Sequence, residues 1–414
     1  MSDWKQQQTK KARLSRRRFV RGTALLLTGV VAACAPAQPS PTPTAPKATP
    51  TVQMPTVGPT DTPTPPPTAT VTPVPPTTTN SIVPTATLQQ PTATPAVLPS
   101  ATPAPATATA TATPIVTPVS RADLVRIYPA AKSRIAFVRH GGACAASGDA
   151  QAALLVKMLD AGIAELTGLT DASQAWRALF DAGEKVAIKV NCISRYTSTV
   201  SLAMAVAGRL HEVVGIPLEH VVIYDRSDYE LERAGYTLNV DGPGVRCYGT
   251  REYAGEYVVN KRATSFSDIL LACDALINIP IPKEHETAGV SVAMKNHYGT
   301  INNPGLMHGG HCDPYIPELN AAPAIRNRAR LIIGDALRMC PYDWNRAVEE
   351  NTLLFAFDPV AHDAIARQLM IARREADGER AGHLQNLSHY IATAAKMGLG
   401  TDDPANMELR EVNL

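Results

Sequence analysis

The sequence lacks the features that mark several classes of protein. Its seven cysteines form no C-x-x-C pair, and this spacing excludes a ferredoxin-type cluster and a zinc ribbon. Aromatic residues make up only 5% of the chain, which disfavours the exposed aromatic platform of a sugar binder. No basic patch with interleaved aromatics occurs, so nucleic acid is not an expected partner. For most of the cysteines we expect buried free thiols.

Positive charge is concentrated at the N-terminus. The whole chain has a net charge of +2 and residues 1–33 contribute +7, so the remainder carries −5. The segment "SRRRFVRG" resembles a twin-arginine export signal, with Arg16 and Arg17 as the pair. The apolar run after it is too short to span a bilayer comfortably. It ends in "VAAC", which resembles a bacterial lipobox with Cys34 as the lipidated residue.

This N-terminal pattern predicts where the protein resides. We expect residues 1–34 to be a signal peptide with lipobox that uses the twin-arginine export machinery. The mature protein would then be lipid-anchored at the cell membrane, on its extracytoplasmic face. The alternative is a plain N-terminal membrane anchor, which places the domain on the same side.

Residues 35–119 have few charges and few large apolar side chains. Pro, Thr, Ala, Ser and Val account for almost all of the segment, with Lys47 and Asp61 as its charged residues. Such a composition buries too little apolar surface to offset the entropy of ordering. We therefore expect a disordered Pro/Thr-rich stalk over residues 35–119. The folded domain is expected over residues 120–414, which suffice for one sizeable core.

Short β-branched runs alternate with longer amphipathic stretches in the folded part. Buried strands are predicted at Ser133–Arg139, Glu184–Val190, Glu219–Asp225, Asp274–Pro280, Ala329–Asp335 and Thr352–Asp358. Helices are predicted at Gln151–Leu166, Leu202–Val214 and Val360–Arg373. Near-continuous apolar strands separated by helices predict an α/β fold: a mostly parallel, Rossmann-like sheet with helices on both faces.

Polar residues follow the predicted strands, where open α/β sheets bind their ligands. They are Asn191, Asp225 with Arg226, the segment "IPKEH" ending at His285, Asp335 and Asp358. Structural alternatives exist for three of them. Asp358 precedes a proline and a helix, so an N-cap is favoured. Asp225 could cap a helix over Ser227–Ala234, and Asp335 could cap or turn.

Lys189 lies inside a strand that should be buried. An unpaired charge at such a position is costly, so this lysine needs a partner or a ligand.

The tract "SVAMKNHYGTINNPGLMHGGHCDP", residues 291–314, concentrates polar and ionisable residues. Helical spacing over Thr287–Asn296 predicts a helix that ends near Lys295 and Asn296. His308 and His311 are separated by two glycines, so a loop could turn both imidazoles toward one transition metal, with Cys312 as an optional thiolate. The alternative is a polar loop with solvated histidines.

Several motifs, in order, resemble the domain-of-unknown-function 362 (DUF 362) family. They are "KVN", "VVIYD", "LINIPIPKEH", "VAMKNHYG", "HCDP" and "LLFAFDPVAHDA", spread over residues 135–373. The resemblance implies a fold and no reaction, because the family's activity is not established. Many relatives carry a cysteine-rich iron–sulfur segment that this chain lacks.

A second, more distant resemblance is to the amino-terminal half of nickel-pincer lactate racemases. His285, Lys295, the turn at Pro304 and Gly305, and His311 follow one another in a similar order. The resemblance implies an acid/base role for His285, a cofactor or substrate anchor at Lys295 and a metal ligand at His311. The implied cofactor is a transition metal or a nickel-type organic cofactor.

Two functional hypotheses follow. The first is a lipid-anchored enzyme, or a cofactor- or metal-binding protein, that takes a small-molecule ligand. Its pocket would combine His285, Lys295 and Lys189 as catalytic residues with Asn191 and Asn296 as binding residues. It predicts that Lys189, His285, Lys295 and His311 converge. The second is a non-catalytic solute-binding or interaction protein of the cell envelope, favoured by the long stalk.

Overall fold

The computed structural model describes residues 132–414. Arg16, Arg17, Cys34 and the stalk predicted over residues 35–119 lie outside the described residues. Across residues 132–414, no helix is both long and apolar enough to cross a membrane. The six cysteines of this part are free, and all but the half-buried Cys144 are buried.

An eight-stranded sheet organises residues 132–414, in the order β12-β1-β11-β10-β7-β2-β3-β4. Seven of these strands point the same way, and β11 runs antiparallel to both of its neighbours. The mostly parallel sheet predicted from the sequence is therefore confirmed. The strands are β1 (Ser133–Arg139), β2 (Val186–Lys189), β3 (Val221–Tyr224), β4 (Arg246–Cys247), β7 (Ala275–Asn278), β10 (Ala329–Met339), β11 (Val348–Ala356) and β12 (Met407–Asn413).

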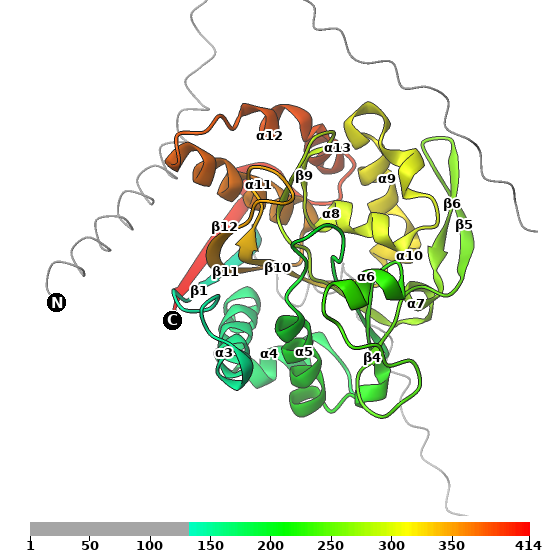
Figure 1. The fold of residues 1–414 in the computed structure, drawn as a ribbon, viewed down its shortest axis with the longest axis vertical. Helices are drawn as coiled ribbons and strands as arrows, with labels where there is room; N and C mark the ends of the chain where they lie inside the picture. Colours follow the sequence, from blue (N-terminus) through cyan, green and yellow to red (C-terminus); the bar gives the residue numbers. More distant parts are fainter. Residues whose placement is uncertain (1–131) are drawn as a thin grey trace, which may run out of the picture. The chain divides into compact units, whose positions relative to one another are not determined.

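Helices cover both faces of the sheet (Figure 1). One face packs against α3 (Gly148–Thr167), α4 (Ala172–Leu179) and α5 (Val200–Arg209), which a short π-helical turn at Leu210–Val214 continues. The opposite face carries α7 (Asp268–Ala272), α8 (Ala293–Asn296), α9 (Tyr315–Ala321), α10 (Pro323–Arg326), α11 (Pro359–Ala376), α12 (Gly382–Leu387) and α13 (His389–Lys396). The short α6 (Asp228–Arg233) follows β3.

The strands are apolar throughout because both of their faces are buried. In β1, Ile135 and Phe137 join the core beneath α11, whereas Ala136 and Val138 join the core beneath α3. Successive side chains of a strand point to opposite faces, so one run of apolar residues supplies both cores.

Two hairpins stand apart from the main sheet. β5 (Tyr253–Val259) pairs with β6 (Arg262–Ser267), and β8 (Lys283–His285) pairs with β9 (Gly289–Ser291). Gly289 has a φ of +72°, and a Cβ there would lie 2.7 Å from the carbonyl oxygen of Leu384. The β8–β9 hairpin therefore needs glycine both for its backbone conformation and for its close packing on α12.

The hairpin corrects one sequence prediction. The helix predicted over Thr287–Asn296 is wrong, because residues 289–291 form β9 and only Ala293–Asn296 are helical. The left-handed conformation of Gly289 interrupts the helical pattern, and pairing with β8 holds the segment extended.

The three aspartates with structural alternatives behave differently from one another. Asp358 caps α11 as expected, because its carboxylate accepts the backbone N–H groups of Val360 and Ala361. Asp225 is not a cap, since Ser227 caps α6 instead. Asp335 lies inside β10, which continues to Met339, and its carboxylate accepts the backbone N–H of Thr199 at the start of α5.

Candidate functional site

The carboxyl ends of β2, β3 and β7 meet where the chain reverses its direction of travel across the sheet. From β2 the chain proceeds to β3 on one side, and β7 later pairs with β2 on the other side. Ligand sites of open α/β sheets lie at such a point. The polar residues Asn191, Asp225 and Asn278 lie at these strand ends and are buried.

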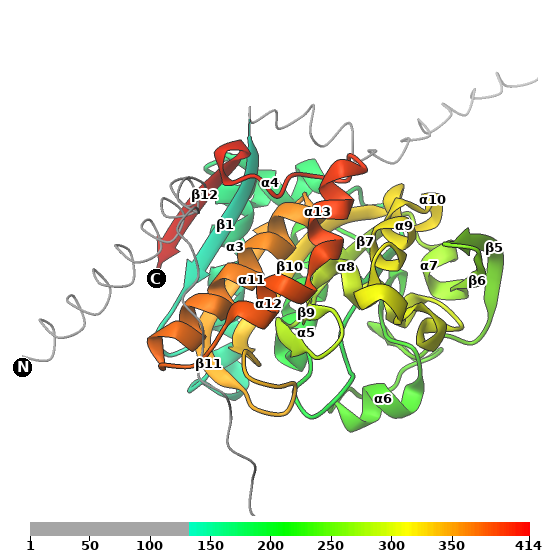
Figure 2. The same ribbon diagram turned by 90° about the horizontal axis from the view of Figure 1, so that it is seen from above.

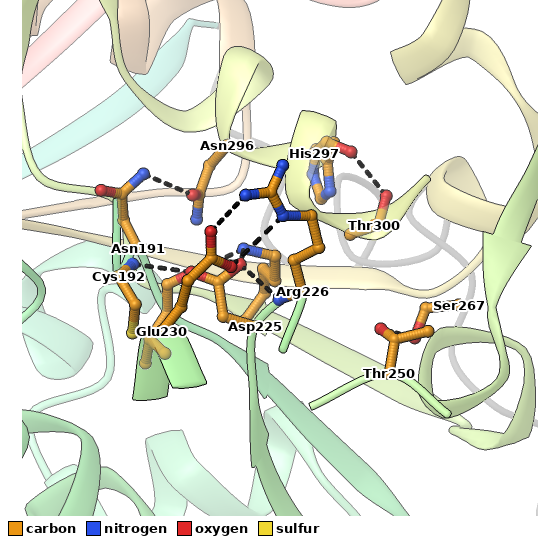
Figure 3. A network of polar contacts seen from close by, with 12 residues as sticks. Asn191, Cys192, Asp225, Arg226, Glu230, Thr250, Ser267, Asn296, His297 and Thr300 are labelled. Carbon is orange, nitrogen blue, oxygen red and sulfur yellow. Dashed lines mark hydrogen bonds and ion pairs between the residues drawn. The ribbon is translucent and has the colours of Figure 1, made fainter. Parts of the chain in front are cut away.

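Lys189 has the partner that its burial demands. Its ammonium lies 2.7 Å from Oδ1 of Asp225 and also donates to the carbonyl oxygen of Val190 at 2.6 Å. Asp225 in turn accepts the backbone N–H of Cys192 (Figure 3). A Cβ on Gly299 would lie 2.6 Å from both charged groups, so this position must remain without a side chain.

Lys283, at the start of β8, is held by three acceptors. Its ammonium donates to Oδ1 of Asn191 at 2.7 Å, to the carbonyl oxygen of Ile193 at 2.7 Å and to Oγ of Ser194 at 3.1 Å. Burial lowers the pKa of Lys283 to about 8. Every N–H of this ammonium has an acceptor, so the side chain ties β8 to the loop that follows β2.

A chain of amides continues from Asn191 into the sheet. Asn191 donates to Oδ1 of Asn296 at 3.0 Å (Figure 3). Asn296 in turn donates to Oδ1 of Asn278 at 2.8 Å. Asn278 donates to the carbonyl oxygen of Ala293 at 2.9 Å. We call Lys189, Asn191, Asp225, Asn278, Lys283 and Asn296 the amide network. The structure thus brings Asn191 and Asn296, both predicted binding residues, into direct contact.

A second group, the Lys295 cluster, comprises His285, Lys295, Tyr298 and His308. The Lys295 ammonium lies 3.5 Å from Nε2 of His308 and 4.7 Å from the centroid of the Tyr298 ring. The rings of His285 and His308 stack with their centroids 5.6 Å apart. Lys295 is 8% exposed, while both histidines are partly exposed and form the outer side of the cluster.

Burial shifts the protonation of the whole cluster toward neutral forms. It lowers the pKa of Lys295 to about 8, against a weaker opposing effect of Cys312. Burial, with the positive charge of Lys295, lowers the pKa of His285 to about 3. The same two causes lower the pKa of His308. Both imidazoles are therefore neutral at pH 7, and Lys295 alone supplies the charge of the cluster.

No carboxylate of residues 132–414 forms an ion pair with Lys295. The buried ion pairs of this part of the chain, Lys189 with Asp225 and Arg330 with Glu184, show the usual solution. A buried ammonium without an anion is costly unless it loses its proton or meets an anionic ligand. The Lys295 cluster is therefore suited to chemistry with a ligand rather than to holding the fold together.

The buried Asp363 of α11 fixes the segment that carries Lys295. Its carboxylate accepts the backbone N–H groups of Ala293 at 2.8 Å and Met294 at 3.1 Å, the first two residues of α8. Tyr390 contacts the same carboxylate at 3.3 Å. Sequence reasoning assigned no role to Asp363, Lys283 or Tyr298. Asp363 lies in the motif "FDPVAHDA", which pointed to the α11 cap at Asp358 but not to this second aspartate.

The predicted convergence of four residues is met in part. His285 and Lys295 share the Lys295 cluster, whereas Lys189 belongs to the amide network. The exposed His311 adjoins His285 through Thr287, whose carbonyl oxygen lies 3.0 Å from Nδ1 of His311 and whose N–H donates to Nδ1 of His285 at 3.2 Å. The His311 ring faces His389.

The three predicted metal ligands are not all grouped together. His308 and the buried Cys312 both lie beside Lys295, whereas His311 faces Thr287. In residues 132–414, no group of three or more His, Cys, Asp or Glu side chains could hold a metal ion. The residues that the structure describes therefore do not by themselves build the site of a metal, and the metal-binding role of His308, His311 and Cys312 stays a prediction.

A small cavity lies beside the amide network. Its volume is about 20 Å³, and Asn278, His297 and Asn320 supply polar lining. This space is enough for a water molecule and too small for a substrate.

Comparison with known proteins confirms the family resemblance. A family model described as "Domain of unknown function (DUF362)" matches residues 186–368, which include every member of the amide network and of the Lys295 cluster. No curated protein matches the chain.

Two solved structures show distant similarity. The lactate racemase apoprotein of Thermoanaerobacterium thermosaccharolyticum is 14% identical with a TM-score of 0.26, over 38% of this chain and 44% of that one. A structural-genomics protein of Thermotoga maritima is 10% identical with a TM-score of 0.31, over 58% of this chain and 59% of that one. The chain thus spans about half the length of each structure.

Proposed function

We propose that the domain is an enzyme or a cofactor-binding protein that holds a small molecule against Lys295. The observation that carries this proposal is the burial of the Lys295 ammonium without a carboxylate partner in residues 132–414. Two states relieve the cost of such burial: the neutral amine and an ammonium paired with an anionic ligand. Both states make Lys295 a binding or reacting group.

The surroundings of Lys295 support a ligand site. The cluster adjoins the carboxyl ends of the parallel strands through Asn296, the next residue in the chain, which belongs to the amide network. His285 and His308 add two neutral imidazoles that can donate, accept or transfer a proton. Lys283 has an acceptor for each of its N–H groups, and Lys189 is paired with Asp225 and the carbonyl oxygen of Val190, so we assign both lysines to positioning the site.

The order of His285, Lys295 and His311 supports a nickel-type organic cofactor as one molecule that Lys295 would anchor. His285 would then exchange protons beside the bound molecule.

We also propose that the protein acts at the outer face of the cell membrane. Arg16 and Arg17 support export by the twin-arginine route, and Cys34 supports a lipid anchor. Replacing Cys34 with Ser should release the protein from the membrane fraction. Replacing both arginines with Lys should keep it in the cytoplasm. Unchanged fractionation of the Cys34→Ser protein would contradict the lipid anchor.

The full-length protein tests the main proposal when produced with its own signal in a host able to mature it. Native mass spectrometry, elemental analysis and an absorption spectrum should reveal a bound molecule or metal. The Lys295→Met protein should lose it, and a Lys157→Met control on the exposed side of α3 should retain it. A wild-type protein that is colourless, metal-free and of bare polypeptide mass would contradict the proposal and favour the non-catalytic envelope protein.

A further inference from the structure

The two histidines of the Lys295 cluster carry their protons on different ring atoms. Nδ1 of His308 lies 3.1 Å from the carbonyl oxygen of Pro304. A carbonyl oxygen only accepts, so in the neutral ring Nδ1 carries the hydrogen and Nε2 keeps its lone pair. That Nε2 is the atom 3.5 Å from the Lys295 ammonium. His308 therefore presents a base to Lys295.

His285 has the opposite tautomer. Its Nδ1 accepts the backbone N–H groups of Thr287 and Ala288, each at 3.2 Å. These two donors oblige Nδ1 to keep its lone pair, so the hydrogen of the neutral ring is on Nε2. They also oppose protonation of Nδ1, in agreement with the lowered pKa of His285. His285 is therefore held as a hydrogen-bond donor, stacked on a histidine that is held as an acceptor.

The Lys295 nitrogen is also less engaged than the other two lysine nitrogens at this end of the sheet. Lys283 has three oxygen acceptors, and Lys189 has a carboxylate and a carbonyl oxygen. Lys295 meets a ring nitrogen and an aromatic face. Once its proton passes to His308, its lone pair is free to attack an electrophile.

We propose that Lys295 is a nucleophile that forms an imine with the aldehyde or ketone group of a small substrate. In this assignment His308 takes the proton and His285 donates a hydrogen bond to the carbonyl oxygen. The inference rests on the proposed function and deepens it, because it names carbonyl compounds as the substrate class.

The step balances without any oxidant or reductant. His308 removes one proton from the ammonium, and the amine nitrogen attacks the carbonyl carbon to give a carbinolamine. The C–O bond then breaks, the two hydrogens left on the amine nitrogen pass to the oxygen, which leaves as water, and a C=N bond joins Lys295 to the substrate. His308 keeps the proton that it took. One amine and one carbonyl compound give one imine and one water.

Reductive trapping tests the assignment. The full-length protein is incubated at pH 8 with pyruvate or with the neutral aldehyde propanal, in the presence of cyanoborohydride, and digested for peptide mass spectrometry. We expect the reduced adduct on Lys295 to form at least tenfold faster than on exposed lysines such as Lys157. Lys189 and Lys283 should stay unlabelled because their N–H groups are engaged. Faster labelling of Lys295 by pyruvate than by propanal would indicate that the substrate carries an acidic group.

Matched variants test separately the roles of Lys295 as the nucleophile, His308 as the base and His285 as the hydrogen-bond donor. Lys295→Arg keeps the charge and should abolish the adduct. His308→Gln removes the base and should slow labelling by about a hundredfold at pH 7, with a smaller deficit at pH 10, where Lys295 is already neutral. A uniform loss at every pH would assign His308 a merely structural role. His285→Gln keeps an N–H donor and should retain more of the rate than His285→Leu.

Two outcomes overturn the inference: no adduct at Lys295 with either probe, or labelling no faster than that of Lys157. The outcome is distinguishable from failure of the proposed function. Suppose that the wild-type protein carries a bound molecule that Lys295→Met lacks, and that the wild-type protein forms no adduct after this molecule has been removed. This result would retain the binding site and reject the imine. Trapping at Lys295 in a protein that carries no bound molecule would retain the imine and reject the resident ligand of the proposed function.

Discussion

The amide network and the Lys295 cluster occupy adjoining stripes of one short segment, residues 293–300, yet they use lysine in opposite ways. Asn296 and Gly299 face the network, where Lys189 pairs with a carboxylate and Lys283 has three oxygen acceptors. Lys295 and Tyr298 face the cluster. There, no carboxylate of residues 132–414 forms an ion pair with the Lys295 ammonium.

Burial alone therefore does not separate a structural lysine from a reactive one. Lys189, Lys283 and Lys295 are all buried, and the pKa of the last two falls to about 8 for the same reason, desolvation. The difference lies in the partners of each nitrogen. Satisfied groups stabilise a fold, whereas a buried charge without a partner destabilises it and is retained for function.

The largest expected effect comes from breaking the ion pair of the network. Lys189→Met leaves the buried carboxylate of Asp225 without its cation, so we expect a loss of about 3–5 kcal/mol in the free energy of unfolding. Urea unfolding measures the loss, and Lys157→Met should change stability by less than about 0.5 kcal/mol. If Lys189→Met lost as little stability as the control, Lys189 would not be a structural lysine.

Lys283→Met should have the second largest effect. It leaves Asn191, Ile193 and Ser194 without a donor, and we expect a loss of about 2 kcal/mol. Hydrogen exchange of the amides in residues 191–194 should accelerate, while exchange in the distant helix α3 stays unchanged. Unchanged exchange at residues 191–194 would mean that Lys283 does not hold this loop.

Lys295→Met should act in the opposite direction. It removes an ammonium that is buried without a carboxylate partner and keeps apolar volume, so we expect a gain of about 1 kcal/mol at pH 7. The same urea titration measures it. A loss of stability would place Lys295 with the structural lysines and abolish the distinction.

The smallest effect is a pH dependence that sharpens the distinction. The pKa of Lys295 is about 8 in the fold and about 10.4 in an unfolded chain. Between these values the unfolded state binds more protons, so stability rises with pH. From pH 7 to 8.5 the wild-type protein should gain about 0.8 kcal/mol relative to Lys295→Met. A difference between the two proteins that is flat across this range would contradict the lowered pKa.

Strands were the part of the fold that could be predicted from sequence. Each of the six predicted runs contains or overlaps a strand of the sheet, because strands buried on both faces must be apolar throughout. The β8–β9 hairpin and α8 could not be predicted, since three- and four-residue elements have no periodicity of their own. Their conformations depend on Gly289 packing on α12 and on Asp363 bonding the start of α8.

The sequence predicted which residues belong to the candidate site better than it predicted which of them lie together. Lys189, Asn191, His285, Lys295 and Asn296 follow strands or lie in a polar tract, and the structure places them in two neighbouring groups. Sequence spacing cannot show that the Lys283 ammonium has an acceptor for every N–H and that the Lys295 ammonium does not. Asn191, which binds Lys283, lies about ninety residues away in the sequence, and His308, which contacts Lys295, lies thirteen residues away.

The pairing at one edge of the sheet constrains the order of folding. β1, the first described strand, lies between β11 and β12 (Figure 2). Ile135 is therefore paired with both Ala356 and Leu409. Contacts so distant in sequence are slow to form, and a ribosome adding about 5–20 residues per second reaches β11 and β12 long after it has made β1. β1 therefore remains an unpaired strand until these distant partners have been made.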